Sequence, residues 1–366
     1  MSIARLIERK EIVICAGAGG VGKTTTAAAI ALGMAQRGLK VAVLTIDPAR
    51  RLANSLGLPE LGNEERQVEI DGSGELWAMM LDPKRTFDDL IEKHAPDERT
   101  RDAVLSNRIY QELSNAVAGS QEYMAMEKLY ELHQEERYDL LVLDTPPSRN
   151  ALDFLDAPER LSRFVDSRSL QLFLRPGRIG LKMFGRGTGM LFSVLKGVTG
   201  VDLLQDLSDF FASFGDMAEG FRDRAARTGE LLADPRTTFL LVTSPRRDAI
   251  DEAIFFHRRL RERKLPFGGV VVNRMSTLAV HGDEVDEAEL EALLGKRLGR
   301  KVASNLADYE AIAIRDRENV ERLTRDLDEG APPILVPHLE DDVHDLSGLL
   351  EMNEYLFAAE AVPAGG

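Results

Sequence analysis

The sequence predicts an α/β fold with a mostly parallel, doubly wound sheet that is covered by helices on both faces. Short apolar runs rich in β-branched residues alternate with longer segments of helical period. Several of these runs are apolar throughout, which is typical of strands buried on both faces. The predicted strands are Ile12–Ala16, Val41–Thr45, Leu76–Leu81, Leu140–Leu143, Thr238–Thr243, Gly269–Val272 and Ile334–Val336.

Two long stretches of helical pattern interrupt the succession of strands and predict an inserted helical subdomain. A first helix is expected from Val21 to Arg37, and Gly38 is placed to end it, because a residue without Cβ tolerates the left-handed conformation. The expected organisation is a core at 10–82, a helical segment at 83–137, core again at 138–154, a helical subdomain at 155–232, core at 233–355 and a flexible tail at 356–366.

The composition agrees with a folded chain, since 44% of the 366 residues are apolar and 29% are charged. The formal charge of −15 argues against a general affinity for nucleic acid or for an anionic membrane. No apolar stretch is long enough to span a bilayer, and the first ten residues carry charges where a signal peptide needs an apolar run. We therefore expect a cytoplasmic protein that could also associate peripherally with a membrane.

The strongest motif is Gly17–Thr24, which fits the pattern G-x-x-x-x-G-K-[ST] at every fixed position and lies between a predicted strand and a predicted helix. Such a glycine loop lets backbone N–H groups converge on phosphates at the positive end of a helix dipole. Lys23 adds a cation for the β- and γ-phosphates, and the Thr24 hydroxyl can coordinate the Mg²⁺ that bridges them. The motif predicts a P-loop NTPase.

Two carboxylates follow apolar strands and are expected near the phosphate end of the sheet. Asp144 ends the run Leu140–Leu143, and Asp47 follows the run that begins at Val41. One of them is expected to hold the metal and the other could position water. Taken alone, either aspartate could equally be a helix N-cap or a turn residue.

Several segments together resemble the ArsA-type ATPases and the related eukaryotic ATPases that target tail-anchored membrane proteins. The similarity covers roughly residues 10 to 355 and is closest to actinobacterial members that occur as paired paralogues. The segments that carry it are Gly17–Thr25, Thr45–Ala49, Leu76–Met79, Asp82–Pro83, Asp144–Pro147, Val271–Asn273 and Pro337–His344.

The resemblance implies a role for each matching residue, with ATP or ADP and Mg²⁺ as ligands. Asp47 would polarise the attacking water, and Asp144 and Thr24 would support Mg²⁺, with Asp47 also near the metal. Asn273 would hydrogen-bond adenine, although a strand-end asparagine is otherwise an ordinary turn residue. The loop Pro337, His338 and Leu339 would close over the base. The residues expected at the phosphates are Gly17, Gly19, Gly20, Val21, Gly22, Lys23, Thr24 and Thr25.

One departure bears directly on activity. The signature lysine of the family, which reaches across a dimer to the nucleotide of the partner, falls at Ala18. The loss of such a cation could reduce the rate by orders of magnitude. Arg50, Arg51 or Arg149 could replace it, or each could be a surface salt-bridge residue. A paralogous subunit that carries the lysine could also complete the site, so we favour a heterodimer over a homodimer.

The single cysteine, Cys15, lies in an apolar run and cannot form an arsenite site of several thiolates, which disfavours arsenite transport. The eukaryotic relatives have a Cys-x-x-Cys pair that binds zinc at their dimer interface. This pair is absent from the sequence, so no zinc site is expected.

Residues 167–201 carry six basic and many apolar side chains but no acidic one. This segment favours a hydrophobic protein or membrane client, with a helical lid or a fixed subunit interface as the alternatives. The sequence thus predicts an ATPase whose dimer switches affinity for a client, with a weakly hydrolysing regulatory subunit as the alternative.

Overall fold

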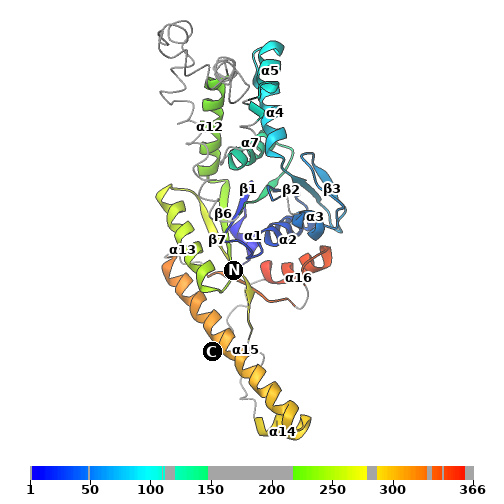
Figure 1. Cartoon of the computed structure of the whole chain (residues 1–366), viewed down its shortest axis with the longest axis vertical. Coiled ribbons are helices and arrows are strands. Elements are labelled where there is room, and N and C mark those ends of the chain that lie inside the picture. Colours follow the sequence, from blue (N-terminus) through cyan, green and yellow to red (C-terminus); the bar gives the residue numbers. More distant parts are fainter. Residues whose placement is uncertain are drawn as a thin grey trace, which may run out of the picture. The chain divides into compact units, whose positions relative to one another are not determined.

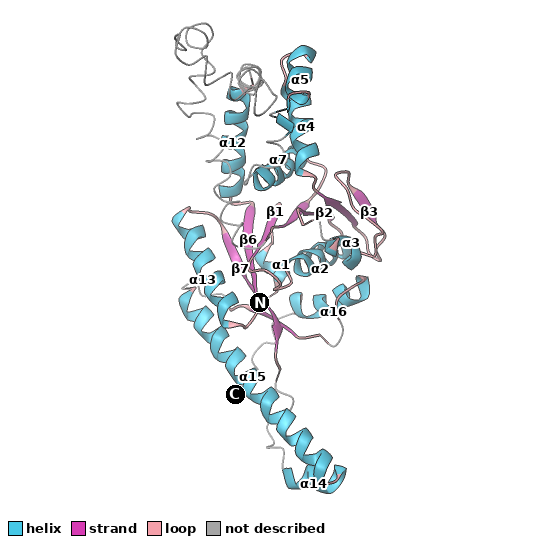
Figure 2. Cartoon of the chain, in the orientation of Figure 1, coloured by secondary structure: helices cyan, strands magenta, loops and turns pink. Residues whose placement is uncertain are grey.

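The computed structural model describes residues 2–47, 50–108, 110–111, 120–146, 217–277, 287–327, 332–339 and 342–358. It contains an eight-stranded sheet of order β3-β4-β2-β5-β1-β6-β7-β8, in which only the β3–β4 pair is antiparallel (Figures 1 and 2). The predicted α/β fold with a mostly parallel sheet is confirmed. The strands are β1 (Ile12–Ala16), β2 (Lys40–Thr45), β3 (Arg66–Val68), β4 (Glu75–Met80), β5 (Leu140–Asp144), β6 (Thr237–Thr243), β7 (Phe267–Met275) and β8 (Ile334–Pro337).

Every strand expected from an apolar run is present in the sheet, and its bounds shift by at most a few residues. β1, β5 and β6 are buried along their whole lengths, as expected for strands covered on both faces. β3 was not predicted, because this three-residue edge strand exposes Arg66 and Gln67 and buries only Val68. Its pairing with β4 comes from the fold and not from its own sequence pattern.

The helices of the sheet unit pack on both of its faces. β1 connects through α2 to β2 on one side of the sheet, and β6 connects through α13 to β7 on the other side. Because such crossovers are right-handed, α2 and α13 lie on opposite faces (Figure 1). The helices of this unit are α1 (Ile3–Leu6), α2 (Lys23–Gln36), α3 (Arg51–Ser55), α13 (Arg247–Glu262), α14 (Glu287–Leu294), α15 (Lys296–Asp326) and α16 (Leu346–Leu356).

The helix predicted from Val21 to Arg37 is α2, which starts two residues later, at Lys23. Its beginning is delayed because Gly22 is left-handed, with φ 93°, and still belongs to the preceding loop. Gly38 follows the C-terminal end with φ 96°, as expected for a residue that ends a helix. The alanines of α2 are fully buried between the sheet and α16.

The chain divides into two compact units. The sheet unit comprises Met1–Met80, Glu136–Leu152 and Ala233–Gly366, and the helical unit comprises Leu81–Glu135 and Asp153–Leu232. The helices described in the second unit are α4 (Pro83–His94), α5 (Glu98–Leu105), α7 (Ser120–Gln134) and most of α12 (Ala218–Ala233). A buried carboxylate, Glu127 on α7, accepts hydrogen bonds from Tyr123 and from Arg224 on α12 within that unit.

The predicted basic and apolar segment at 167–201 lies outside the described residues, as do Pro48, Ala49 and Arg149. Among the helices that are described, none combines the length and the apolar character needed to cross a bilayer.

Candidate functional site

The phosphate loop joins β1 to α2 at the carboxyl end of the sheet, where the strand order reverses and ligands bind in folds of this class. Gly17 passes so close to β6 that a Cβ there would lie 1.9 Å from the carbonyl oxygen of Val242. A Cβ on the left-handed Gly22 would lie 2.3 Å from Nδ2 of Asn273. Both positions therefore require glycine, and the loop follows its path without a side chain in the way.

Lys23 occupies the first turn of α2, and only 7% of its surface is exposed. Its Nζ donates a hydrogen bond to the carbonyl oxygen of Ala18, 2.8 Å away, so the ammonium is held within the curve of the loop. Burial lowers the pKa of Lys23, and the nearby carboxylates of Asp144 and Asp47 oppose that shift. The structure thus places a cation inside the loop that the motif predicts for phosphates.

Asp144 ends β5 and is 2% exposed. Its Oδ2 accepts hydrogen bonds from the hydroxyl of Thr24 at 2.6 Å and from the hydroxyl of Thr45 at 2.9 Å. The other carboxylate oxygen, Oδ1, is buried and has no hydrogen-bond partner. An unpartnered buried oxygen is costly unless a ligand completes it, so this atom marks a place for a cation.

These donors fit Mg²⁺. The ion prefers hard oxygen ligands, and it usually takes one or two from the protein and the rest from phosphates and water. The Asp144 carboxylate and the Thr24 hydroxyl, which lie next to the loop, are the two oxygen ligands that the protein would supply. Among the described residues there is no cluster of three or more carboxylate, imidazole or thiol groups that could hold a metal by themselves, and a phosphate-bridging ion does not need one.

Burial raises the pKa of Asp144 to about 6, and the hydroxyls of Thr24 and Thr45 and the ammonium of Lys23 oppose the shift. The pKa of this group is therefore higher in the folded than in the unfolded chain, so between about pH 4 and 6 the folded state binds the extra proton. The ligand-free protein is expected to gain stability as the pH falls through that window, by up to about 3 kcal/mol from this group.

The measurement is the free energy of unfolding at several pH values for wild type and Asp144→Asn. The asparagine variant is expected to lack this gain, and Asp71→Asn, which changes an exposed carboxylate of the same unit, serves as the control. Parallel pH profiles for wild type and Asp144→Asn would contradict the assignment.

Asp47 follows β2 and shares Thr45 with Asp144. Its backbone N–H donates to the Thr45 hydroxyl at 3.1 Å, while that hydroxyl donates to Asp144. The Asp47 carboxylate is partly exposed and forms an ion pair of 3.7 Å with Arg51, whose side chain is 65% exposed. The structure thus brings Asp47, Asp144, Thr24 and Lys23 to one end of the loop. Thr45 was not predicted at the site, although a hydroxyl at the end of the strand next to β5 could have indicated it.

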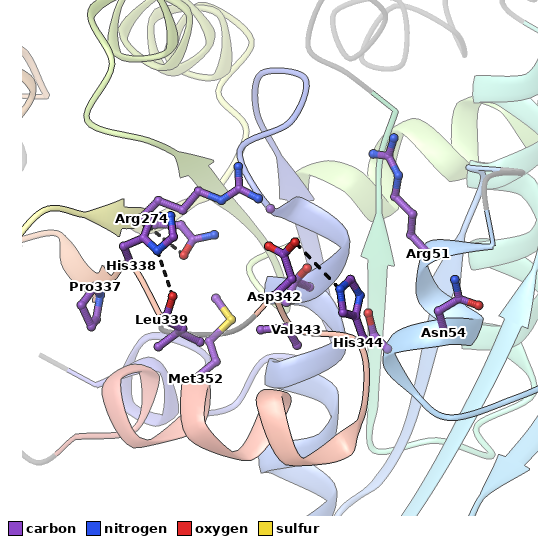
Figure 3. Close-up of a pocket in the computed structure, with 14 residues that line it drawn as sticks. Arg51, Asn54, Arg274, Pro337, His338, Leu339, Asp342, Val343, His344 and Met352 are labelled. Carbon is purple, nitrogen blue, oxygen red and sulfur yellow. Dashed lines mark hydrogen bonds and ion pairs between the residues drawn. The ribbon is translucent and has the colours of Figure 1, made fainter.

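Asn273 lies in β7 against the other side of the loop. Its Nδ2 donates to the carbonyl oxygen of Val21 at 3.0 Å, and its Oδ1 accepts the backbone N–H of Arg274 at 2.9 Å. Beside it is a cavity of about 350 Å³ (Figure 3). The cavity is lined by Gly22, Thr25, Arg51, Asn54, Ser55, Asn273, Arg274, Pro337, His338, Leu339, Asp342, Val343, His344 and Met352.

The cavity unites residues that lie far apart in the sequence. Thr25, Asn273 and the segment Pro337–Leu339 were all predicted to contact one ligand, and they line the same space. The imidazole Nδ1 of His338 lies 2.9 Å from the carbonyl oxygen of Leu339, which fixes the ring within this segment. Arg274 and Met352 also line the cavity and were not foreseen. The mixed polar and apolar lining has the character of a small-ligand site.

Comparisons with known proteins identify the family of the chain. A family model described as anion-transporting ATPase matches residues 10–292. ATPase GET3 of Malassezia globosa is 27% identical over 244 residues, which cover 66% of this chain and 66% of that protein. ATPase get3 of Aspergillus terreus is 25% identical over 334 residues, covering 88% of this chain and 92% of that protein. The predicted resemblance is confirmed, and the chain belongs to the anion-transporting ATPase family.

Proposed function

We propose that the chain is a Mg²⁺-dependent ATPase that binds ATP or ADP at the loop between β1 and α2. The observation that carries the proposal is the unpartnered Oδ1 of Asp144, buried beside Thr24 at the end of a loop that already encloses the Lys23 ammonium. Family membership supports an ATPase in general. The roles of individual residues follow from the site geometry together with the resemblance.

In this proposal the chain acts mainly by placing charges around the phosphates. Backbone N–H groups of Gly19–Gly22 would point at the phosphate oxygens, and Lys23 would exchange its bond to Ala18 for one to the β- and γ-phosphates. Thr24 and Asp144 would hold Mg²⁺, which would neutralise the charge that develops during transfer. Asp47 would orient the attacking water, because its carboxylate is partly exposed and its backbone shares the Thr45 hydroxyl with Asp144.

Asn273 would recognise the base. Its side-chain amide uses one donor on Val21 and one acceptor site on Arg274, so a second N–H and a second lone pair remain. An asparagine amide can pair bidentately with N7 and the N6 amino group of adenine. The segment Pro337–Leu339 would form the apolar cover of that base.

We further propose that hydrolysis opens and closes a dimer, and that this cycle controls affinity for a hydrophobic protein or membrane client. Support comes from the resemblance, which implies that the loops after Asp47 and Asp144 are switches. Such loops are held by the γ-phosphate and Mg²⁺ and are released after hydrolysis. A paralogous subunit that carries the lysine lacking at Ala18 is the favoured partner. We propose that residues 167–201 contact this client. We also keep the domain boundaries that the sequence predicts as part of the proposal.

The test is calorimetry with ATP and ADP in the presence of Mg²⁺, followed by turnover of the purified chain alone and after mixing with its paralogue. Uptake of nucleotide with turnover in either assay supports the proposal. Retained binding with no turnover in both assays would favour the alternative, a regulatory subunit that binds nucleotide without hydrolysing it. Absence of nucleotide uptake by folded protein would refute both.

Ala18→Lys tests how the chain associates. If two copies pair in the manner of the family, the new ammonium would reach the partner's phosphates, and turnover is expected to rise by about 10-fold or more. The measurement is turnover against protein concentration, with Ala18→Gln as a control of similar length but without charge. No increase of turnover in the lysine variant would contradict a homodimer of this kind. The heterodimer with a paralogous subunit would then remain as the proposed assembly.

A further inference from the structure

Arg274 has an unusual backbone conformation at the edge of the nucleotide site. It follows Asn273 in β7, at a place where the register with β8 shifts between Val272 and Met275. Its φ is 61°, in the left-handed region, which costs a non-glycine residue of order 1 kcal/mol. Such strain persists where surrounding contacts impose it and is concentrated at functional sites.

The side chain of Arg274 is tied to the phosphate loop. Its Nη1 donates to the carbonyl oxygen of Gly20 at 3.3 Å, while the neighbouring Asn273 holds the carbonyl oxygen of Val21. Two successive residues of β7 therefore bind two successive carbonyl groups of the loop. Arg274 also lines both the cavity beside Asn273 and a second cavity of about 260 Å³ on the other side of the loop.

Arg274 forms no ion pair with any carboxylate of the described residues, although Asp342 lines the same cavity. The other described arginines of these two cavities each have an acidic partner, in the pairs Arg51–Asp47, Arg246–Asp248 and Arg315–Asp316. Within the part of the chain that the structure describes, Arg274 has no such ion pair, and its guanidinium uses one of five donors. A planar cation beside a cavity and without an acidic partner is available to a ligand.

We propose that Arg274 is a base-contacting residue whose side chain covers one face of the adenine ring. In Figure 3, Arg274 extends along one side of the cavity, and Leu339 and Met352 lie on the other side. A guanidinium stacks on aromatic faces and is attracted to them, and apolar side chains suit the opposite face. The bond from Nη1 to the carbonyl oxygen of Gly20 ties the guanidinium to the loop. This inference rests on the proposed function, because it takes the ligand to be an adenine nucleotide.

The test compares ADP with inorganic pyrophosphate, which has the phosphates but no base. Arg274 is exposed, so Arg274→Ala is expected to weaken ADP binding by about 2- to 5-fold, the range of a cation–π contact at an exposed site, and to leave pyrophosphate binding, measured by competition, unchanged. Arg274→Gln keeps a donor for the Gly20 carbonyl but lacks the planar charge, so it is expected to lose ADP affinity as the alanine variant does. Arg246→Ala, at the second cavity and 74% exposed, is the matched control and is expected to bind as wild type.

Each other outcome overturns the inference. An equal loss for ADP and pyrophosphate would make Arg274 a phosphate ligand, and full affinity in Arg274→Gln would reduce it to a tether of the loop. Unchanged ADP binding in Arg274→Ala would remove any role in the site. If wild type itself takes up no ADP, the proposed function fails, whereas normal uptake by both proteins refutes only the role of Arg274.

Discussion

Lys23→Ala is expected to abolish ATP turnover and to weaken nucleotide binding by about 100-fold, the size of one or two charge-assisted hydrogen bonds. The ammonium is already held at the centre of the loop, so it needs to move only from the Ala18 carbonyl to the phosphates. Its loss removes the one cation that the described structure encloses within the loop. The measurements are calorimetric affinity for ADP and ATP and the steady-state rate.

Lys10→Ala is the matched control, since this lysine also donates to a main-chain carbonyl, that of Pro235, but lies away from the loop. It is expected to bind and hydrolyse as wild type. The thermal midpoint of each variant shows whether the fold is intact. Wild-type affinity in a folded Lys23→Ala variant would contradict the assignment of the phosphate site.

The sheet could be predicted because its strands carry their own signal. Apolar runs such as Ile12–Ala16 and Leu140–Leu143 have no polar face, and only burial on both sides accommodates them. The loop could be predicted for the same local reason, because its glycines and Lys23 form one contiguous motif. Local patterns of this kind do not depend on the rest of the fold.

Features that depend on distant partners could not be predicted in the same way. β3 forms only because it can pair with β4. The 31-residue α15 is exposed over much of its length, including at Leu298, Tyr309 and Ile314, and its buried face depends on the elements that it packs against. Arg274 is an ordinary arginine in sequence, and its relation to Gly20 spans 254 positions.

The site shows the same division. The pairing of Asp144 with Thr24 and Thr45 requires the parallel register of β5 with its two neighbours, which sets Asp144 beside Cys15 on β1 and beside Thr45 on β2. The residue pattern alone indicated two strand-end carboxylates without separating them, and the resemblance implied different roles; the register shows how their surroundings differ. Asp144 is buried between hydroxyls, and Asp47 is partly exposed beside Arg51.

This difference in environment underlies the second large effect. Asp47→Asn is expected to retain nucleotide binding and to lower turnover by about 10²- to 10⁴-fold, because the amide matches the carboxylate in shape but cannot accept a proton from water. Its contacts with the backbone remain possible, and Lys23, Thr24 and Asp144 are untouched. The measurements are the steady-state rate and the affinity for ADP, which separate catalysis from binding.

The ion pair with Arg51 offers an alternative cause for any loss in the Asp47 variant, and Arg51→Ala separates the two. That pair spans 3.7 Å and its arginine is largely exposed, so its net contribution to stability is about 0–1 kcal/mol. Arg51→Ala is therefore expected to keep turnover within a few-fold of wild type. An equal fall in both variants would assign the effect to the arginine, as the cation that replaces the lysine missing at Ala18, and not to the orientation of water by Asp47.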